Sequence, residues 1–256
     1  MTAGADGPRL LPPRPLGELG KVALFLDLDG TLADIQPRPQ DVKPEPWRTS
    51  LLHRLRSALD GRVAVISGRT IEDVDRILDG AAPAVGAVHG LVRRRGDGGV
   101  VSAPASPWLQ RAREEVAALA RERPGLELED KGLSLAVHYR RAPDLAELVK
   151  SRARTIAERA QLKLQLGDMV AEICAQGSDK GSAVRAFMRE RPFEGALPVF
   201  VGDDLTDENG FEAARALGGM GVLVGPERAT MAERRLAGVA AVRAWLEEGL
   251  QQETAK

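Results

Sequence analysis

Residues 22–31 read VALFLDLDGT, an apolar run that ends abruptly in two carboxylates, Asp27 and Asp29. The run VALFL is short and partly β-branched, which is typical of a buried strand. Because side chains alternate faces along a strand, Asp27 and Asp29 can point the same way where the strand ends. Two like charges this close are unfavourable unless a cation or a reaction uses them. The segment therefore predicts an active site at the carboxyl end of a strand, with Asp27 as candidate nucleophile and a divalent metal beside it.

Two other local structures have similar sequences. An Asp-Gly pair is common in turns, and this is the alternative for Asp29-Gly30. A calcium-binding loop also begins with alternating acids, but it needs a further acidic position and a distal Glu. Position 31 is Thr, and the later ligands are not found at the required spacing, so the calcium loop is set aside.

The composition is that of a globular protein in a reducing compartment. The 256 residues are 43% apolar and 29% charged with a net charge of −1, so nothing favours nucleic acid as a partner. A single cysteine, Cys174, excludes an intrachain disulfide and a zinc site built on thiolates. No apolar stretch is long enough to span a bilayer, and the N-terminus lacks the pattern of a secretion signal. We therefore expect a cytoplasmic protein with no membrane partner.

Apolar runs alternate with helical patterns in the two outer parts of the chain. The expected strands are 22–27, 62–66, 84–88, 197–201 and 220–224, and the expected helices include 47–59, 71–78 and 207–217. Such near-continuous apolar strands predict a parallel sheet that is covered on both faces. Ligands bind outside the carboxyl ends of the strands in these sheets, and Asp27, Ser67 and Asp203 all fall there.

The middle of the chain has a different pattern. The string GDGG at 96–99 predicts a tight hairpin, and two helices are expected at 106–122 and 143–159. Four alternating stretches, LELE, LSLAVHY, LKLQL and MVAEI, predict an antiparallel sheet and so a separate α+β unit. The chain is thus divided into a flexible lead-in at 1–20, a core built from 21–95 and 177–256, and an inserted unit at 96–176.

The strand-end residues suit phosphoryl transfer through a covalent intermediate. A carboxylate nucleophile, here Asp27, would split hydrolysis into two displacements. Asp29 is placed to protonate the leaving oxygen and later to deprotonate water. Ser67 offers a hydroxyl donor at the end of the second strand, and the Gly68 backbone can approach phosphate oxygens closely.

Lys180 is the third candidate. It lies in GSDKGSAVRAFM, where Ser178 could cap the helix that follows. A lysine in the first turn of a helix opposes the macrodipole, which makes sense if its ammonium faces a phosphate and the Asp27 carboxylate. A solvent-exposed lysine is the alternative.

The fourth candidate segment is GDDLTDE at 202–208. Asp207 and Glu208 are explained by the start of a helix, where acids are favourable. That does not explain Asp203 and Asp204, which directly follow an apolar strand. Oxygen ligands of this kind suit magnesium, which usually keeps several waters and a substrate phosphate.

Together, DLDGT, SGR at 67–69, the lysine before a helix and GDD with a further Asp resemble the four motifs of the haloacid dehalogenase-like phosphatases. The resemblance implies an α/β fold with a Rossmann-like parallel-sheet haloacid dehalogenase core and an inserted α+β cap domain. It implies catalytic roles for Asp27, Asp29 and Lys180, with Asp29 also offering its backbone carbonyl to the metal. The implied phosphate-binding residues are Ser67, Gly68 and Arg69, and the implied Mg2+ residues are Asp27, Asp29, Asp203, Asp204 and Asp207.

A narrower resemblance runs from about residue 22 to residue 247. The strings EDKGLSLAVHYRRAP, SDKG, FVGDDLTDENGF, GGMGVLVG and RLAGVAAVRAWL are similar to those of the trehalose-6-phosphate phosphatase family. Membership would imply hydrolysis of trehalose 6-phosphate in trehalose biosynthesis, by a monomer whose only partner is a small sugar phosphate. In that family cap residues hold the sugar, and the matching positions here are Glu129, Lys131, His138, Arg140 and Glu172.

The chain departs from the family pattern in two places. After His89-Gly90 the family typically continues Ala-Glu, where this chain has Leu91-Val92. After Glu172 and an isoleucine the family usually has Lys-Pro, where this chain has Cys174-Ala175. These changes leave two alternatives open: a phosphatase for another sugar phosphate, such as a sucrose or mannosyl phosphate, or a sugar-phosphate sensor that has lost catalysis.

Overall fold

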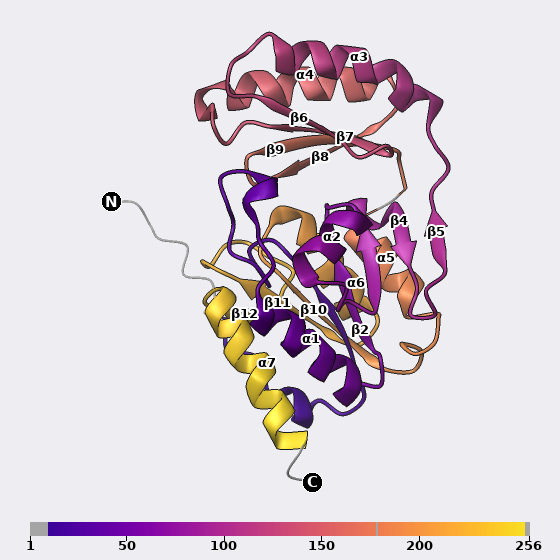
Figure 1. Cartoon of the computed structure of the whole chain (residues 1–256), viewed down its shortest axis with the longest axis vertical. Coiled ribbons are helices and arrows are strands. Elements are labelled where there is room, and N and C mark those ends of the chain that lie inside the picture. Colours follow the sequence, from indigo (N-terminus) through magenta and orange to yellow (C-terminus); the bar gives the residue numbers. More distant parts are fainter. Residues whose placement is uncertain (1–9, 178, 254–256) are drawn as a thin grey trace.

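The chain forms a large sheet and a smaller one that lies over its end (Figure 1). The computed structural model describes residues 10–177 and 179–253. The large sheet has eight strands in the order β12-β11-β10-β1-β2-β3-β4-β5, parallel from β12 to β3. The strands are β1 Val22–Leu26, β2 Val63–Ile66, β3 Ala84–Ala87, β4 Val92–Arg94, β5 Val100–Ser102, β10 Leu197–Gly202, β11 Met220–Val224 and β12 Arg234–Leu236.

Helices cover both faces of this sheet, which explains why the central parallel strands β1, β2, β3, β10 and β11 are apolar at nearly every position. In β1 the side chains of Leu24 and Leu26 belong to one apolar cluster, and Phe25 belongs to another. The first cluster is completed by α1 Pro46–Ala58, α2 Ile71–Leu78 and α7 Val239–Glu253, and the second by α5 Lys180–Phe187 and α6 Glu208–Ala216. The predicted parallel α/β core is therefore confirmed.

The small sheet is antiparallel and carries helices on one face. Its order is β6-β7-β9-β8, with β6 Glu127–Asp130, β7 Ser134–His138, β8 Lys163–Gly167 and β9 Val170–Cys174. The helices α3 Pro107–Arg121 and α4 Ala146–Arg159 bury apolar side chains against the outer face. The other face of the sheet is turned toward the carboxyl ends of the core strands (Figure 1).

Short 3-10 helices lie in the connections. They are η1 Leu16–Glu18, η2 Pro39–Asp41, η3 Val88–Gly90, η4 Pro143–Leu145 and η5 Leu205–Asp207. Helix η3 directly follows β3, and η5 is separated from the end of β10 by Asp203 and Asp204, so both lie at the edge where ligands bind in such folds. None of the helices within the described residues has the length and apolar character needed to cross a membrane.

Two predicted boundaries differ from the structure. The hairpin at 96–99 joins β4 to β5, and both strands extend the large sheet, so the chain leaves the core after Ser102 rather than at residue 96. The predicted flexible lead-in packs on the core over its described part, because Leu16 is buried against α7 and the Arg14 carbonyl accepts a hydrogen bond from Trp245. Residues 1–9 of the lead-in lie outside the described residues.

Close packing of α5 on α6 depends on a glycine at the start of α5. A Cβ built on Gly181 would lie 2.2 Å from the Asn209 carbonyl oxygen, so no larger residue fits without moving the backbone. Because Gly181 follows Lys180, this close approach also sets where the lysine side chain begins.

We expect Gly181→Ala to lower the free energy of unfolding by about 1–3 kcal/mol, because the added methyl group collides with backbone. Gly238→Ala is the matched control, since a Cβ there meets nothing within 4 Å. This control should lower the free energy of unfolding by less than about 1 kcal/mol, because glycine is only modestly preferred over alanine at the position before a helix. Urea unfolding of both variants measures the difference, and equal stability of the two would contradict the packing argument.

Candidate active site

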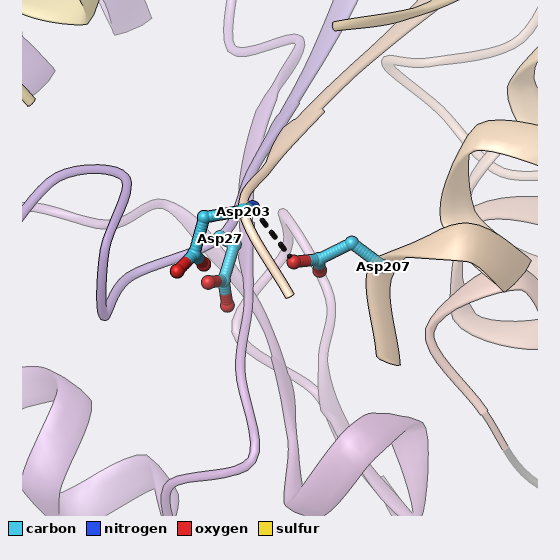
Figure 2. A group of neighbouring side chains, drawn as sticks. All are labelled: Asp27, Asp203 and Asp207. Carbon is cyan, nitrogen blue, oxygen red and sulfur yellow. Dashed lines mark hydrogen bonds between the residues drawn. The ribbon is translucent and has the colours of Figure 1, made fainter. Parts of the chain in front are cut away.

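The carboxyl ends of neighbouring strands bring the catalytic candidates together. Asp27 follows β1 and Asp203 follows β10, and these two strands pair in parallel. The Asp27 amide continues the ladder by donating to the Val201 carbonyl over 2.9 Å. Figure 2 shows the result, in which the carboxylates of Asp27 and Asp203 lie side by side and Asp207, the last residue of η5, faces them from just before α6.

Lys180 is buried among these acids and is not a surface lysine. Its ammonium donates to Asp27 Oδ1 over 2.8 Å and to Asp207 Oδ1 over 2.6 Å. Burial alone would lower the pKa of Lys180, but the Asp207 and Asp27 charges outweigh it and raise the pKa, so the ammonium stays charged. Helix α5 is capped by Asp179, which accepts from the Ser182 amide over 2.7 Å. The predicted capping residue Ser178 lies outside the described residues.

Asp207 organises the loop that carries Asp203. Its Oδ2 accepts hydrogen bonds from the amides of Asp203 and Asp204 over 3.0 and 2.9 Å, while its Oδ1 faces Lys180. The side chain is fully buried. Asp207 therefore fixes both the backbone of the GDD loop and the position of the lysine.

Three carboxylates fit a hard divalent cation. One oxygen each from Asp27, Asp203 and Asp207 lies within 4.8 Å of the others, and this is the one such group found among the described residues. Asp203 Oδ1 is buried and has no hydrogen-bond partner within the part of the chain described. Burial and the Asp207 charge raise the pKa of Asp203 to about 7. Burial likewise raises the pKa of Asp27, although Lys180 opposes this. An all-oxygen set with an unsatisfied buried carboxylate is what magnesium uses.

Asp29 and Arg69, from two different motifs, form a bidentate ion pair. Arg69 Nε and Nη2 donate to the two oxygens of Asp29, each over 2.7 Å. Arg69 Nη1 also donates to the Pro39 carbonyl, and the Arg69 amide donates to Ser67 Oγ. Arg69 was predicted to bind phosphate. In the structure its side chain holds Asp29, the residue predicted to act as both general acid and general base, in place at the cavity.

Asp204 was predicted as a metal residue and lies outside the acidic group. Its Oδ1 accepts from the Leu205 amide over 2.7 Å, and its Oδ2 accepts from the Asp168 amide of the small sheet over 3.2 Å. Its side chain therefore faces the β8–β9 turn, and burial raises its pKa.

A cavity separates the core strand ends from the small sheet. Of the sequence-predicted site residues, all but Asp207 line it. The core contributes Asp27, Asp29, Ser67, Gly68, Arg69, Lys180, Asp203 and Asp204, and the small sheet contributes Glu129, Lys131, His138, Arg140 and Glu172.

Strand register explains how the small sheet presents these side chains. Glu129 on β6 pairs with Ala136 on β7, which in turn pairs with Glu172 on β9, so all three share one face. His138 lies two residues beyond Ala136 on that face and its Nε2 is 2.8 Å from Glu129 Oε2. The small residue between the two glutamates leaves room in the middle of the wall.

Glu172 is held by several groups. It accepts hydrogen bonds from Lys131 over 2.9 Å and from Ser134, and it lies 3.2 Å from His89 Nε2. Burial would raise the pKa of Glu172, but Lys131 and His89 outweigh it and hold the pKa well below its ordinary value. Lys131 is correspondingly held charged, because Glu172 and Glu129 outweigh the effect of burial and raise its pKa.

His89 is a cavity residue that sequence reasoning missed. It lies in η3 with a left-handed backbone at φ 53° and is buried, and burial lowers its pKa. A Cβ on Gly68 would lie 2.5 Å from His89 Nε2, so the glycine of the SGR motif leaves space for this ring. The one sequence signal was the pair His89-Gly90 after a predicted strand, which sequence reasoning used only to locate the departure at 91–92.

The residues that depart from the family pattern do not line the cavity. Leu91 and Cys174 are buried in the apolar cluster of the core, and Ala175 packs against it. Val92 begins β4 at the far side of the sheet and packs on the same cluster. The apolar side chains at these four positions therefore suit the apolar cluster that they belong to or pack against.

Fold and site together define a phosphatase of the haloacid dehalogenase-like class. A solved "trehalose-6-phosphate phosphatase related protein" is 27% identical, with a TM-score of 0.76 over 91% of this chain and 99% of that one. The C-terminal domain of the C. albicans trehalose-6-phosphate phosphatase shares the fold at 22% identity, with a TM-score of 0.81 over 91% and 93% of the two chains.

Sequence comparison narrows the class. The family model for trehalose-phosphatase matches residues 25–239. The chain is 42% identical to the trehalose-6-phosphate phosphatase of Escherichia coli K12 over 89% of its own length and 86% of the relative. It is 36% identical to a probable trehalose-phosphate phosphatase of Sinorhizobium fredii, over 82% and 80% of the two chains. This chain belongs to the trehalose-phosphatase family.

We expect the Cys174 thiol to be unreactive in the folded protein, because burial raises its pKa to about 12. At about pH 8 it should react with a chromogenic disulfide reagent more than about a hundredfold more slowly than in the unfolded chain. Stopped-flow absorbance with and without denaturant makes the comparison. Rapid labelling of the native protein would show that residue 174 is exposed to solvent.

We expect Glu172→Gln to lower the free energy of unfolding by about 3–5 kcal/mol at neutral pH, because Lys131 is then left buried without its strongest partner. The depressed pKa of Glu172 contributes stability above its unfolded value of about 4.5, and that contribution declines as the pH falls toward the lower folded value. The difference between wild type and variant should therefore shrink below about pH 4.5.

Urea unfolding across a pH series measures this difference. Glu147→Gln is the matched control, since its side chain is 89% exposed and its ion pair with Lys150 contributes less than about 1 kcal/mol. A difference between wild type and Glu172→Gln that does not depend on pH would contradict the assigned charge state.

Proposed function

We propose that this chain hydrolyses trehalose 6-phosphate to trehalose and phosphate, through a phosphorylated Asp27, in trehalose biosynthesis. One observation carries the proposal. A buried carboxylate held by Lys180 opens into the same cavity as a wall of polar side chains from the small sheet. Membership of the trehalose-phosphatase family supports the choice of sugar. We also propose that the core is formed by the large sheet and the substrate cap by the inserted small sheet.

In the first step Asp27 attacks phosphorus, forming a carboxylate oxygen–phosphorus bond while the bond from phosphorus to the sugar oxygen breaks. Lys180 holds Oδ1 of Asp27, which leaves the other oxygen for the attack. Its ammonium also lies where negative charge develops on the phosphoryl oxygens, the main source of catalysis in this chemistry. Ser67 and Gly68 line the same cavity, and we infer that the Ser67 hydroxyl and the Gly68 backbone bind those oxygens.

Asp29 manages the proton in both steps. It gives a proton to the departing sugar oxygen, and in the second step it takes one from the water that attacks phosphorus and frees Asp27. Arg69 occupies both carboxylate oxygens of Asp29, so the ion pair must open before Asp29 can reach the sugar oxygen or the attacking water. Substrate entry and release of Arg69 are thereby linked, because an incoming phosphate competes for the guanidinium.

We propose that Asp27 and Asp203 hold Mg2+, and that Asp207, whose two oxygens are taken by Lys180 and the loop amides, supports the site from behind. When bound, the ion supplies positive charge beside the phosphoryl oxygens and offsets the surplus of carboxylates. The monomeric state and the cytoplasmic location expected from the sequence stay predictions.

Another sugar phosphate is less well supported than trehalose 6-phosphate. The motive for that alternative was the altered residues at 91–92 and 174–175, and these pack in or against the apolar cluster of the core and do not line the cavity. The intact Asp27, Asp29, Lys180 and Asp203 argue against a silent sensor, since binding alone needs no nucleophile or acid.

We expect phosphate release from trehalose 6-phosphate to require Mg2+ and to exceed release from sucrose 6-phosphate and glucose 6-phosphate. Asp27→Asn should lower kcat by at least about a thousandfold, because the amide cannot form the phosphoenzyme. A phosphate-detection assay of the substrate panel, with and without a chelator, measures both effects, and circular dichroism shows whether the variant is folded.

Each other outcome has a distinct meaning. Preference for a different sugar phosphate would keep the catalytic assignment and overturn the substrate. Near wild-type turnover by Asp27→Asn would overturn the nucleophile. If the folded wild-type protein released phosphate from none of the substrates, the sugar-phosphate sensor would be the remaining alternative.

A further inference from the structure

Asp204 connects the catalytic loop to the small sheet. It directly follows Asp203, yet its carboxylate accepts the Asp168 amide at the β8–β9 turn, 36 residues away in the chain. Its other oxygen is taken by the Leu205 amide. Both oxygens are therefore used within the protein, and one of them spans the boundary between core and small sheet.

A glycine on the opposite side makes this approach possible. A Cβ built on Gly167 would lie 2.8 Å from Asp204 Oδ2 and 3.0 Å from a Val170 methyl group. Gly167 is not among the residues with positive φ, so its backbone would accept alanine and the constraint at this position is space. The turn and Asp204 thus fit each other closely.

The β8–β9 turn also contacts a residue that lines the cavity. The carboxylate of Asp168 accepts a hydrogen bond from Arg140 Nη2 over 2.8 Å, and the same nitrogen donates to the Asp168 carbonyl over 3.1 Å. Both Arg140 and Asp168 line the cavity. The position of Arg140 over the site therefore depends on the position of the turn.

The core end of the contact is equally fixed. The Asp204 amide donates to Asp207, and the Asp204 carbonyl accepts from Arg228 over 2.9 Å. Asp207 also fixes the Asp203 amide and contacts Lys180. The turn consequently docks on backbone that is held by the catalytic residues themselves.

We propose that Asp204 is a positioning residue that docks the β8–β9 turn and, through Asp168, holds Arg140 over the bound sugar, and that it is not a metal ligand. The role of the sugar rests on the proposed function. The docking contact itself does not, since it is defined by Asp204, Gly167 and Asp168 alone.

Two variants disturb this contact from opposite sides. Asp204→Ala removes the acceptor, and Gly167→Ala places a methyl group against it. For both we expect the KM for trehalose 6-phosphate to rise about tenfold, the loss of one hydrogen bond to a charged group, with kcat less affected. For p-nitrophenyl phosphate, which carries no sugar to meet Arg140, Gly167→Ala should match wild type. Gly238→Ala is the control for the alanine substitution itself.

A readout without turnover accompanies the kinetics. Hydrogen exchange should speed up in the peptide that contains the β8–β9 turn in both variants, and stay unchanged in Gly238→Ala. Asp168→Ala should raise the KM for the sugar phosphate without exposing the turn by as much, because the backbone amide that Asp204 accepts remains.

A metal-binding role for Asp204 would give a different pattern. Asp204→Ala would then raise the Mg2+ concentration needed for half-maximal turnover of both substrates, while Gly167→Ala would behave as wild type. That result, or unchanged exchange of the turn in both variants, would overturn the proposal. If wild type hydrolyses p-nitrophenyl phosphate but no trehalose 6-phosphate, the proposed function fails, and the exchange measurement still decides the docking role.

Discussion

The site depends on one buried ammonium. Lys180 can be taken out of water because Asp27 and Asp207 both contact it, and these acids can lie close together because the lysine is between them. Parallel pairing of β1 with β10 places Asp27 beside Asp203. Gly181 lets α5 pack closely on α6, and Lys180 at the start of α5 then reaches the acids. Three carboxylates against one ammonium still leave surplus negative charge, which explains why a divalent cation fits here.

The small sheet forms the opposite wall of the cavity, and it stabilises its charged side chains in a different way. Its charged side chains are paired within the protein, Glu172 with Lys131 and Glu129 with Lys131 and, through a hydrogen bond, with His138. Burial raises the pKa of Asp27, whereas Lys131 and His89 hold the pKa of Glu172 low despite its burial. One wall thus keeps an unsatisfied charge for a metal and a phosphoryl group, while the other offers paired polar groups that suit a ligand rich in hydroxyls.

Local sequence signals predicted what depends on local structure. The strand and turn around Asp27 and the helix over residues 71–78 follow from periodicity and breaker residues, and the structure has them at those positions. His89, Asp168 and the docking role of Asp204 depend on contacts between segments far apart in the chain, which periodicity cannot show. Asp204 was assigned to the metal because, like Asp203, it directly follows an apolar strand, but on a strand-end loop adjacent side chains point in different directions. The β4–β5 hairpin was assigned to the insert because an antiparallel turn does not reveal which sheet its strands extend.

On the proposed function, reaction chemistry and substrate choice are carried by different sheets, and the contacts between the two sheets decide how they are coupled. His89 reaches Glu172 from the end of β3, Asp204 reaches Asp168 from the end of β10, and Gln40 reaches Glu127 over 3.4 Å. The first two begin at strand ends next to the catalytic residues, and the second joins the small sheet to the loop that carries Asp203. A shift of the small sheet would therefore also move that loop. Substitutions in the apolar core at 91 and 174 touch neither contact directly. On the proposed function, we therefore expect sugar recognition to depend less on these departures from the family pattern than on how firmly the small sheet docks.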